Sequence, residues 1–260
     1  MQDKKYLLSI VQLLEMETAT EQQLLVQRCF RWLDTERFNR VKRLLGGEKV
    51  DAVKQITAGS QMNRKLAEHI GAGMLLQLAI LQAETEDDLQ LTKAAARSEL
   101  QFGDAEMIEL SIQGLLVLLE QSGKEPVALE YTYGDNGKPY LKNYPYYFNL
   151  SHSGEYIFCV ISEDEVGVDI QRTKPLKDDR IARRFFSEEE KQALAACSTA
   201  AERQELFYRL WACKEAYGKL TGRGIAATLD TAMESLKEFV LREYQIKDYQ
   251  IAVCKWKQES

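Results

Sequence analysis

The residues best suited to chemistry in this chain are a few polar side chains that interrupt apolar segments. In the segment from Val166 to Gln171, strand alternation places Asp169 and Gln171 on the same face. Two oxygen-bearing side chains with a glycine beside them could hold a hard cation such as Mg²⁺. A half-exposed strand with a polar solvent face has the same pattern, so this segment alone leaves both interpretations open.

A second group of charged residues lies on a predicted helix nearer the C-terminal end. Trp211, Glu215 and Lys219 are spaced four apart and share one face, whereas Lys214 lies about 100° around the helix from Glu215. A carboxylate with two ammonium groups around it could hold a metal ion and bind phosphate oxygens. An ordinary Glu–Lys pair on a solvated helix, worth about 0.2–0.5 kcal/mol, has the same spacing. The helix geometry does not decide between the two.

The small number of histidines excludes several kinds of site. With only His69 and His152, neither an H-E-x-x-H helix nor a three-histidine metal site is possible. The glycines at 71–73 and 137 do not complete a nucleotide-binding loop. We expect His69 to be a structural residue of an apolar helix. The polar segment 149–154 is predicted to be a loop that displays His152, which either binds a phosphate or has no role.

Composition excludes further classes of protein. The 260 residues are 45% hydrophobic and 28% charged, which is typical of a folded globular chain. A net charge of −6 argues against nucleic acid as the main ligand, because binding to phosphate backbones needs a basic face. The five cysteines form no C-x-x-C motif, and the apolar run from Ile70 to Leu81 is shorter than the about 20 residues that span a bilayer. We therefore expect a cytoplasmic protein with no membrane or nucleic-acid partner.

The pattern of predicted elements changes near Tyr144-Pro145. The first part is mainly helical, and the second has strands followed by helices, which predicts an α+β fold with lobes 1–145 and 146–260. Helices are predicted at 21–33, 63–81, 106–120, 180–186, 187–194 (opened by a capping box at Ser187) and 202–220. Strands are predicted at 127–133, 147–150, 156–162, 166–170 and 249–256, with 156–162 and 166–170 as a hairpin.

Five motifs in this order resemble the 4′-phosphopantetheinyl transferases of the two-lobed surfactin-synthetase type. They are Gly137-Lys-Pro139, Phe148 to Gly154, Val166 to Ile170, Ile181 to Ser187 with Glu190, and Phe207 to Ala216 with Lys219. The resemblance implies two similar lobes related by a pseudo-twofold axis, antiparallel sheets with packed helices, and a ligand in the cleft between the lobes. The first lobe has an extra helical insertion at about residues 80–125, for which either a packing role or a partner surface is open.

The resemblance also assigns the chemistry. It implies Mg²⁺ as the cofactor, with Asp169, Gln171 and Glu215 at the metal positions. Because the family often has Glu at the position of Gln171, we expect either weaker cation binding or a water in that position, without loss of activity. The catalytic positions are Glu215, Lys219 and Glu190, and the general base stays open among Glu215, Glu190 and a metal-bound water.

The positions implied for coenzyme A are spread along the chain. They are Arg37 and Arg40 for the nucleotide phosphates, Lys138 and Pro139 for the adenine side, Ser151 and His152 for the 3′-phosphate, and Lys219 and Lys214 for the pyrophosphate. The implied reaction transfers 4′-phosphopantetheine from coenzyme A to a serine of an apo acyl or peptidyl carrier protein and releases adenosine 3′,5′-bisphosphate. We expect a monomer. The alternative is a non-catalytic coenzyme A-binding scaffold or sensor with the same fold.

Overall fold

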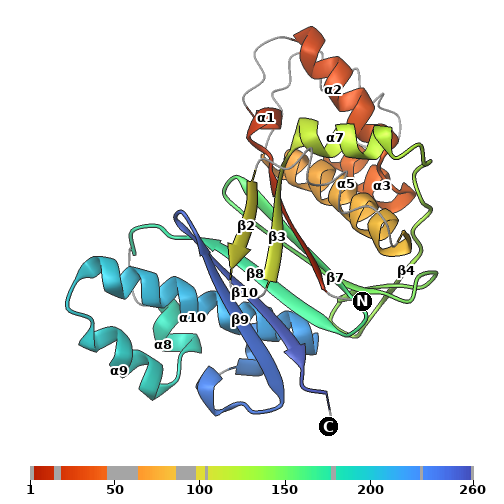
Figure 1. Ribbon diagram of the computed structural model, residues 1–260. Helices are drawn as coiled ribbons and strands as arrows, with labels where there is room; N and C mark the ends of the chain where they lie inside the picture. Colours follow the sequence, from red (N-terminus) through yellow and green to blue (C-terminus); the bar gives the residue numbers. More distant parts are fainter. Residues whose placement is uncertain are drawn as a thin grey trace. The chain divides into compact units, whose positions relative to one another are not determined.

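The computed structural model of the chain describes residues 3–14, 19–45, 64–85, 98–102, 105–176, 180–228 and 231–258 (Figure 1). Residue contacts divide the chain into two compact units. Unit 1 comprises residues 1–3, 131–154 and 160–260, and unit 2 comprises residues 4–130 and 155–159. The predicted lobes, 1–145 and 146–260, and their pseudo-twofold relation stay predictions.

Unit 2 is a sheet covered by helices. Its elements are β1 (Lys4–Ser9), α1 (Val11–Leu14), α2 (Ala19–Arg31), α3 (Thr35–Leu44), α5 (Arg64–Glu84), β2 (Ser98–Phe102), β3 (Ala105–Ser111), α7 (Ile112–Gln121) and the first part of β7 (Tyr156–Ser162). The strands follow the order β2-β3-β1-β7, with β1 and β3 parallel and β2 and β3 antiparallel. Helix α5 packs on β1, and α7 packs on β3. Leu7 and Leu8 of β1 and Met107 and Leu110 of β3 are buried.

The prediction of a helix over 106–120 is wrong in its first half. Residues 105–111 form β3, which pairs with strands on both sides, and the helix begins only at Ile112. Apolar residues in this stretch fit both periods, and the two neighbouring strands decide the outcome. Within the insertion predicted to be helical at about 80–125, the structure therefore has β2 and β3 before α7, and residues 86–97 lie outside the described part.

Helix α5 is the central helix of unit 2. It is long and apolar enough to cross a membrane by length and composition, but 83% of its most apolar window is buried inside the structure. Its buried Gln77 donates from Nε2 to the Val127 carbonyl and accepts from the Val127 N–H, both at 2.9 Å. These two hydrogen bonds pair both polar atoms of the buried amide, as is usual for polar groups in a protein core.

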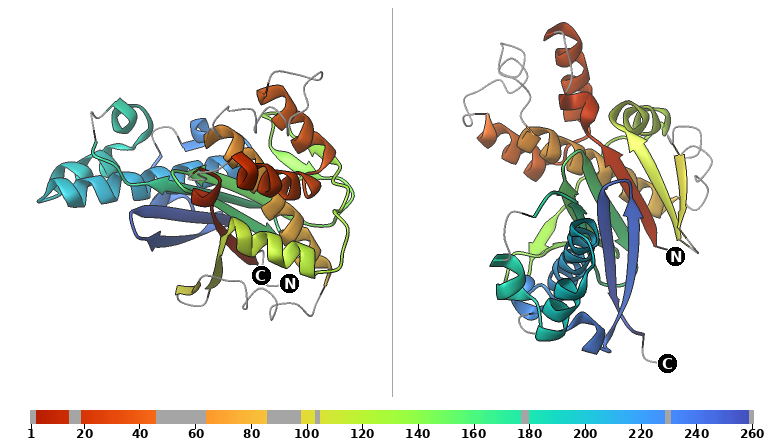
Figure 2. Two further views of the ribbon diagram at one scale, coloured as in Figure 1. Left: turned by 90° about the horizontal axis from the view of Figure 1, so that it is seen from above. Right: turned by 90° about the vertical axis from the view of Figure 1, so that its left-hand side faces the viewer.

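Unit 1 combines an antiparallel sheet with a long helix. Its elements are β4 (Tyr131–Tyr133), β5 (Pro139–Leu141), β6 (Tyr147–Ser153), the end of β7, β8 (Val166–Arg172), α8 (Arg180–Phe185), α9 (Glu188–Ala196), α10 (Ala200–Thr221), η1 (Ile225–Thr228), η2 (Met233–Ser235), β9 (Phe239–Ile246) and β10 (Tyr249–Trp256). The sheet has the order β8-β10-β9, and α10 packs on β8 and β10 (Figure 2). The α+β class is confirmed.

Local signals predicted the helices of unit 1 better than the strand pairing. The helix over 180–186 and the capping box at Ser187 are confirmed, and a second capping box at Thr199 opens α10. The hairpin of 156–162 with 166–170 is wrong, because β8 pairs with β10. Since β10 lies far along the chain, no local pattern reports that pairing.

Candidate functional site

Strand β6 holds β8 through alternate side chains that point the same way. Asn149 Oδ1 accepts from the Val168 N–H at 3.1 Å, and Ser153 Oγ accepts from the Arg172 N–H at 2.9 Å. Between them, Ser151 Oγ donates to Asp169 at 2.7 Å. The polar segment predicted to be a loop is thus part of a strand whose polar face fixes the position of Asp169.

This strand separates the two residues predicted to bind the 3′-phosphate. Ser151 is buried and bonded to Asp169, whereas His152 is exposed. Successive residues of a strand point to opposite faces, so the two side chains cannot converge on one phosphate while this strand stays regular. The role of His152 in binding phosphate stays a prediction.

Asp169 is the centre of the polar group. It is 2% exposed, and its Oδ1 atom accepts from Ser151 Oγ and from Lys219 Nζ, each at 2.7 Å. Its Oδ2 atom accepts from Gln171 Nε2 at 2.7 Å, and Lys219 Nζ also donates to Ser151 Oγ at 2.9 Å. The structure therefore brings together four of the predicted site residues, namely Ser151, Asp169, Gln171 and Lys219.

A glycine lets α10 lie close enough for this contact. A Cβ atom at Gly167 would stand 2.1 Å from the Ala216 carbonyl oxygen and 2.3 Å from the Leu220 nitrogen. The backbone of α10 thus rests directly on β8, which places Glu215 and Lys219 beside Asp169. The charged residues of β8 and those of α10 therefore form one group.

Glu215 is the residue of this group whose charge is least compensated. Among the described residues its carboxylate accepts no hydrogen bond. Burial raises the pKa of Glu215 above its usual value, and the Asp169 carboxylate raises it further, while Lys219 lowers it. Two close carboxylates share a single ammonium group here, which leaves a net negative site.

The donor set fits a weakly held divalent cation. Asp169, Glu215 and the amide oxygen of Gln171 are hard oxygen ligands of the kind that Mg²⁺ takes. In the part of the chain that the structure describes, no three His, Cys, Asp or Glu side chains gather as a metal site. The third predicted ligand, Gln171, is an amide, so the site contains only two carboxylates. The Nε2 atom of Gln171 donates to Asp169.

We expect Glu215→Gln to raise the melting temperature of the metal-free protein at pH 7. Because the pKa of Glu215 is raised in the folded protein, the protonated carboxyl group favours the fold over the ionised one. This contribution to stability is fully present below the pKa of the unfolded chain, about 4.3. It is lost as pH rises through the folded pKa, so the ionised Glu215 of the wild type lowers stability at pH 7. The gain of the variant should shrink toward zero near pH 4 in a series of thermal melts. Glu205→Gln, an exposed change on the same helix, should show no such trend. Equal stability of Glu215→Gln and wild type at pH 7 would contradict this explanation.

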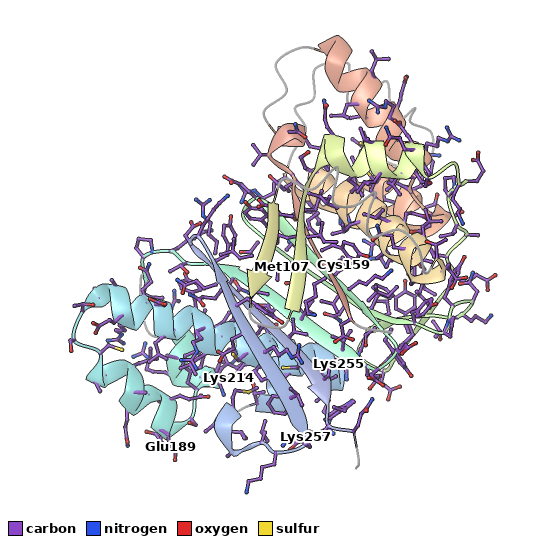
Figure 3. The ribbon with its side chains drawn as sticks, in the orientation of Figure 1. Met107, Cys159, Glu189, Lys214, Lys255 and Lys257 are labelled. Atoms are coloured by element: carbon purple, nitrogen blue, oxygen red, sulfur yellow. The ribbon has the colours of Figure 1, made fainter. Side chains whose placement is uncertain are left out.

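Lys214 and Glu190 form a buried ion pair apart from this group. The side chain of Lys214 is labelled in Figure 3. It is 0% exposed, and its Nζ lies 2.9 Å from Glu190 Oε2 and donates to the carbonyls of Thr228 and Thr231 at 3.2 and 2.7 Å. Glu190 also accepts from the N–H groups of Ser187 and Met233. With these partners, both charges hold α9, α10 and the segment after η1 together, and the structure does not direct either of them to Asp169.

The remaining predicted residues belong to other elements. Lys138 is buried next to the end of α10, where its Nζ donates to the Leu220 carbonyl at 2.8 Å, and Pro139 begins β5. Arg37 and Arg40 lie on α3 of unit 2, and Arg40 pairs with Glu36. The nucleotide roles of these four residues stay predictions.

A groove of about 600 Å³ adjoins the polar group in unit 1. Gln171 lines it, so the groove reaches the side chain that is bonded to Asp169. Aromatic side chains line the groove together with cationic ones: Lys174, Pro175, Leu176, Arg180, Ile181, Arg184, Phe185, Phe207, Tyr208 and Trp211. The sequence motifs contain several of these residues, but their gathering around one groove was not predicted.

Gln250 is a site neighbour that the sequence analysis missed. It stands opposite Gln171 in the pairing of β10 with β8 and is 6% exposed, and its Nε2 has no partner in the described structure. A polar residue inside an otherwise apolar strand was the available signal. A buried amide without a partner is rare enough to mark this end of β8 as unusual.

The comparisons with known proteins agree with the motifs. Residues 165–258 match the family model described as "4'-phosphopantetheinyl transferase superfamily". The chain is 41% identical over 136 residues to 4′-phosphopantetheinyl transferase psf-1 of Bacillus pumilus, covering 46% of this chain and 57% of that protein. It is 33% identical over 148 residues to a 4′-phosphopantetheinyl transferase of Bacillus subtilis, covering 51% and 65%.

The family match covers most of the part of the chain that holds the site. The chain spans between about half and two thirds of the length of these two relatives. The matched family segment includes β8 and α10, which carry Asp169, Gln171, Glu215 and Lys219. The resemblance predicted from the motifs is confirmed: residues 165–258 of this chain are related to the 4′-phosphopantetheinyl transferase superfamily.

Proposed function

We propose that this protein transfers the 4′-phosphopantetheine group of coenzyme A to a serine hydroxyl of an apo carrier protein. The observation that carries the proposal is the contact of Asp169 with Lys219 beside Glu215, within a segment that matches the superfamily. The relatives named above are called 4′-phosphopantetheinyl transferases. We further propose that it acts as a cytoplasmic monomer of the surfactin-synthetase type.

In this proposal the serine oxygen attacks the β-phosphorus of coenzyme A. The bond from that phosphorus to the bridging oxygen breaks, and adenosine 3′,5′-bisphosphate leaves. Asp169, Glu215 and Gln171 would hold Mg²⁺, which supplies charge neutralisation at the pyrophosphate. Lys219, whose ammonium group donates to Asp169, would stabilise the charge that develops on a phosphate oxygen.

The serine proton needs an acceptor, and the structure favours Glu215 over Glu190. Glu190 already accepts two backbone N–H groups and pairs with Lys214. Glu215 accepts no hydrogen bond from the described residues, so its carboxylate is available to accept the serine proton. We therefore assign proton transfer to Glu215 and a structural role to Glu190.

The carrier protein is the occupant that we propose for the groove next to Gln171. Aromatic side chains line the groove, and Lys174, Arg180 and Arg184 add positive charge. Ile181 is 40% exposed beside them. An acidic carrier helix with one apolar residue would complement this surface and bring its serine toward Asp169.

Reversing the charge of Arg184 should weaken the carrier interaction selectively. We expect Arg184→Glu to raise KM for the carrier about tenfold, because rim charges steer association, while KM for coenzyme A stays unchanged. Initial rates at varied carrier concentration measure this effect. Arg242→Glu on β9, an exposed arginine outside the groove, is the control. An unchanged carrier KM in Arg184→Glu would remove the groove from the proposal.

The alternative is a coenzyme A-binding protein without transferase activity. One observation favours it: both oxygens of Asp169 already accept hydrogen bonds, one of them from the Gln171 amide. The two functions are separated by incubating the protein with an apo carrier, coenzyme A and Mg²⁺ and weighing the carrier by mass spectrometry. A gain of one phosphopantetheine that EDTA prevents supports the transferase. Coenzyme A binding with no gain on an acyl and a peptidyl carrier supports the alternative.

A further inference from the structure

Ser151 on β6 joins the two charged residues at the centre of the polar group. Its Oγ atom donates to Asp169 Oδ1 at 2.7 Å and accepts from Lys219 Nζ at 2.9 Å. Lys219 Nζ itself donates to the same oxygen of Asp169 at 2.7 Å. The serine is 5% exposed, so this contact lies inside the protein. The hydroxyl therefore closes a triangle of hydrogen bonds with the carboxylate and the ammonium group.

The donor of this hydroxyl is already used. A serine side chain has a single O–H donor, and in Ser151 it is given to Asp169. Phosphate oxygens are acceptors, so the Ser151 side chain could bind an ionised phosphate only by releasing Asp169. The observed contacts therefore disagree with the 3′-phosphate role that the family resemblance implies for this side chain.

The same hydroxyl limits the orientation of the lysine. An ammonium group has three N–H donors, and in Lys219 two of them are given to Ser151 and Asp169. Because the three donors are arranged tetrahedrally, fixing two of them fixes the direction of the third. The Lys219 side chain is 29% exposed, so the group is still open to a ligand. Without Ser151 one anchor would remain, and the ammonium group could turn about it.

The position of the hydroxyl is set by the strand. Ser151 lies between Asn149 and Ser153 on one face of β6, since alternate residues share a face. Asn149 accepts from the Val168 N–H, and Ser153 accepts from the Arg172 N–H, so β6 is held to β8 on both sides of Ser151. A hydroxyl on this strand is thus a more rigid anchor than the long lysine side chain that it holds.

We propose that Ser151 is a positioning residue that acts through Lys219 and does not contact the 3′-phosphate of coenzyme A with its side chain. It gives the Lys219 ammonium group a second anchor beside Asp169 and so directs the remaining N–H group. This inference rests on the proposed function, in which Lys219 stabilises charge that develops on a phosphate oxygen. Ser151 then contributes to kcat and not to the recognition of the 3′-phosphate.

The test compares coenzyme A with dephospho-coenzyme A, which lacks only the 3′-phosphate. We expect Ser151→Ala to lower kcat for transfer about tenfold, the size expected when a hydrogen bond to a charged group is lost. KM for coenzyme A should stay within about twofold, because the lost interaction acts in the transition state. The ratio of the Kd values for the two ligands should be the same in Ser151→Ala and in wild type.

Two further variants separate this role from a general effect on the strand. Ser153→Ala removes a hydroxyl from the same face of β6 that contacts the backbone of β8, and it should leave kcat unchanged. In Lys219→Met, which removes the ammonium group, adding Ser151→Ala should lower the residual kcat no further, because two residues that act as one unit are not additive.

A second measurement does not depend on transfer. NMR spectra of the lysine ammonium groups report how firmly each group is held, and the signal that Lys219→Met removes identifies Lys219. We expect a slowly exchanging signal in wild type that broadens in Ser151→Ala, because a group with one anchor exchanges its protons with water faster. A signal that is the same in both proteins, or absent from both, would contradict the ordering of Lys219 by Ser151.

Three results of the kinetic and binding experiments would overturn the inference. A rise in the Kd for coenzyme A but not for dephospho-coenzyme A in Ser151→Ala would assign the side chain to the 3′-phosphate. An unchanged kcat in Ser151→Ala, or an equal loss in Ser153→Ala, would remove the positioning role. A further loss in the Lys219→Met background would show that Ser151 does not act through Lys219. If wild type transfers nothing, the proposed function fails, and the ammonium signal still decides whether Ser151 orders Lys219.

Discussion

Asp169→Asn should reduce transfer of phosphopantetheine by more than about a thousandfold, the scale of losing a main electrostatic contributor in a buried site. The substitution keeps the size of the side chain but removes the charge that Lys219 contacts at 2.7 Å. It also removes one of the two carboxylates proposed to hold Mg²⁺. The rate of mass gain on an apo carrier measures the loss.

The fold should survive this change. Asn can still accept from Ser151 and Lys219, so we expect circular dichroism and the melting transition to stay cooperative. Asp248→Asn, which removes a partly exposed carboxylate paired with Arg172, serves as a control and should retain full activity. Transfer at the wild-type rate by Asp169→Asn would refute the assignment of Asp169.

Lys214→Met should lower the stability of the protein far more than any substitution of Lys219. Lys214 is 0% exposed and Glu190 is 7% exposed, and removing one partner leaves a buried charge without compensation. Such a loss typically costs about 3–5 kcal/mol. Chemical denaturation should therefore show a large fall in the free energy of unfolding for Lys214→Met, whereas Lys219→Met should lose activity with a smaller change in stability, because Lys219 is partly exposed.

A double variant distinguishes the ion pair from simple packing. Glu190→Gln combined with Lys214→Met removes both charges, so it should recover part of the stability lost in Lys214→Met. If Lys214→Met is as stable as wild type but has lost activity, Lys214 acts on the pyrophosphate, as the family resemblance implies, and the structural role assigned here is wrong.

Many of the helices could be predicted from local sequence patterns. The capping box of Ser187 with Glu190 predicted the start of α9, and the apolar stripe predicted α10 nearly to its ends. Strand partners were not predictable, because β8 pairs with β10, which lies far along the chain. Strand β3 was mistaken for helix since its apolar residues fit both periods, and only its two neighbouring strands decide between them.

The site was also predicted in part, because local patterns show which side chains of one element share a face. Alternation placed Asp169 and Gln171 on one face of β8, and helical spacing placed Glu215 with Lys219, so the structure needed only to bring β8 and α10 together. Sequence spacing could not show that Lys214 is buried against Glu190, because burial depends on α9 and the segment after η1. It also could not show that Lys138 bonds to the end of α10.

The central claim is that this site joins phosphopantetheine to a carrier serine and does not merely bind or hydrolyse coenzyme A. The most direct measurement follows both products of one reaction, the phosphopantetheine gained by the carrier and the adenosine 3′,5′-bisphosphate released. We predict equal molar amounts of the two, with a requirement for Mg²⁺. Release of adenosine 3′,5′-bisphosphate without a gain on the carrier, or neither product while coenzyme A stays bound, would contradict the claim.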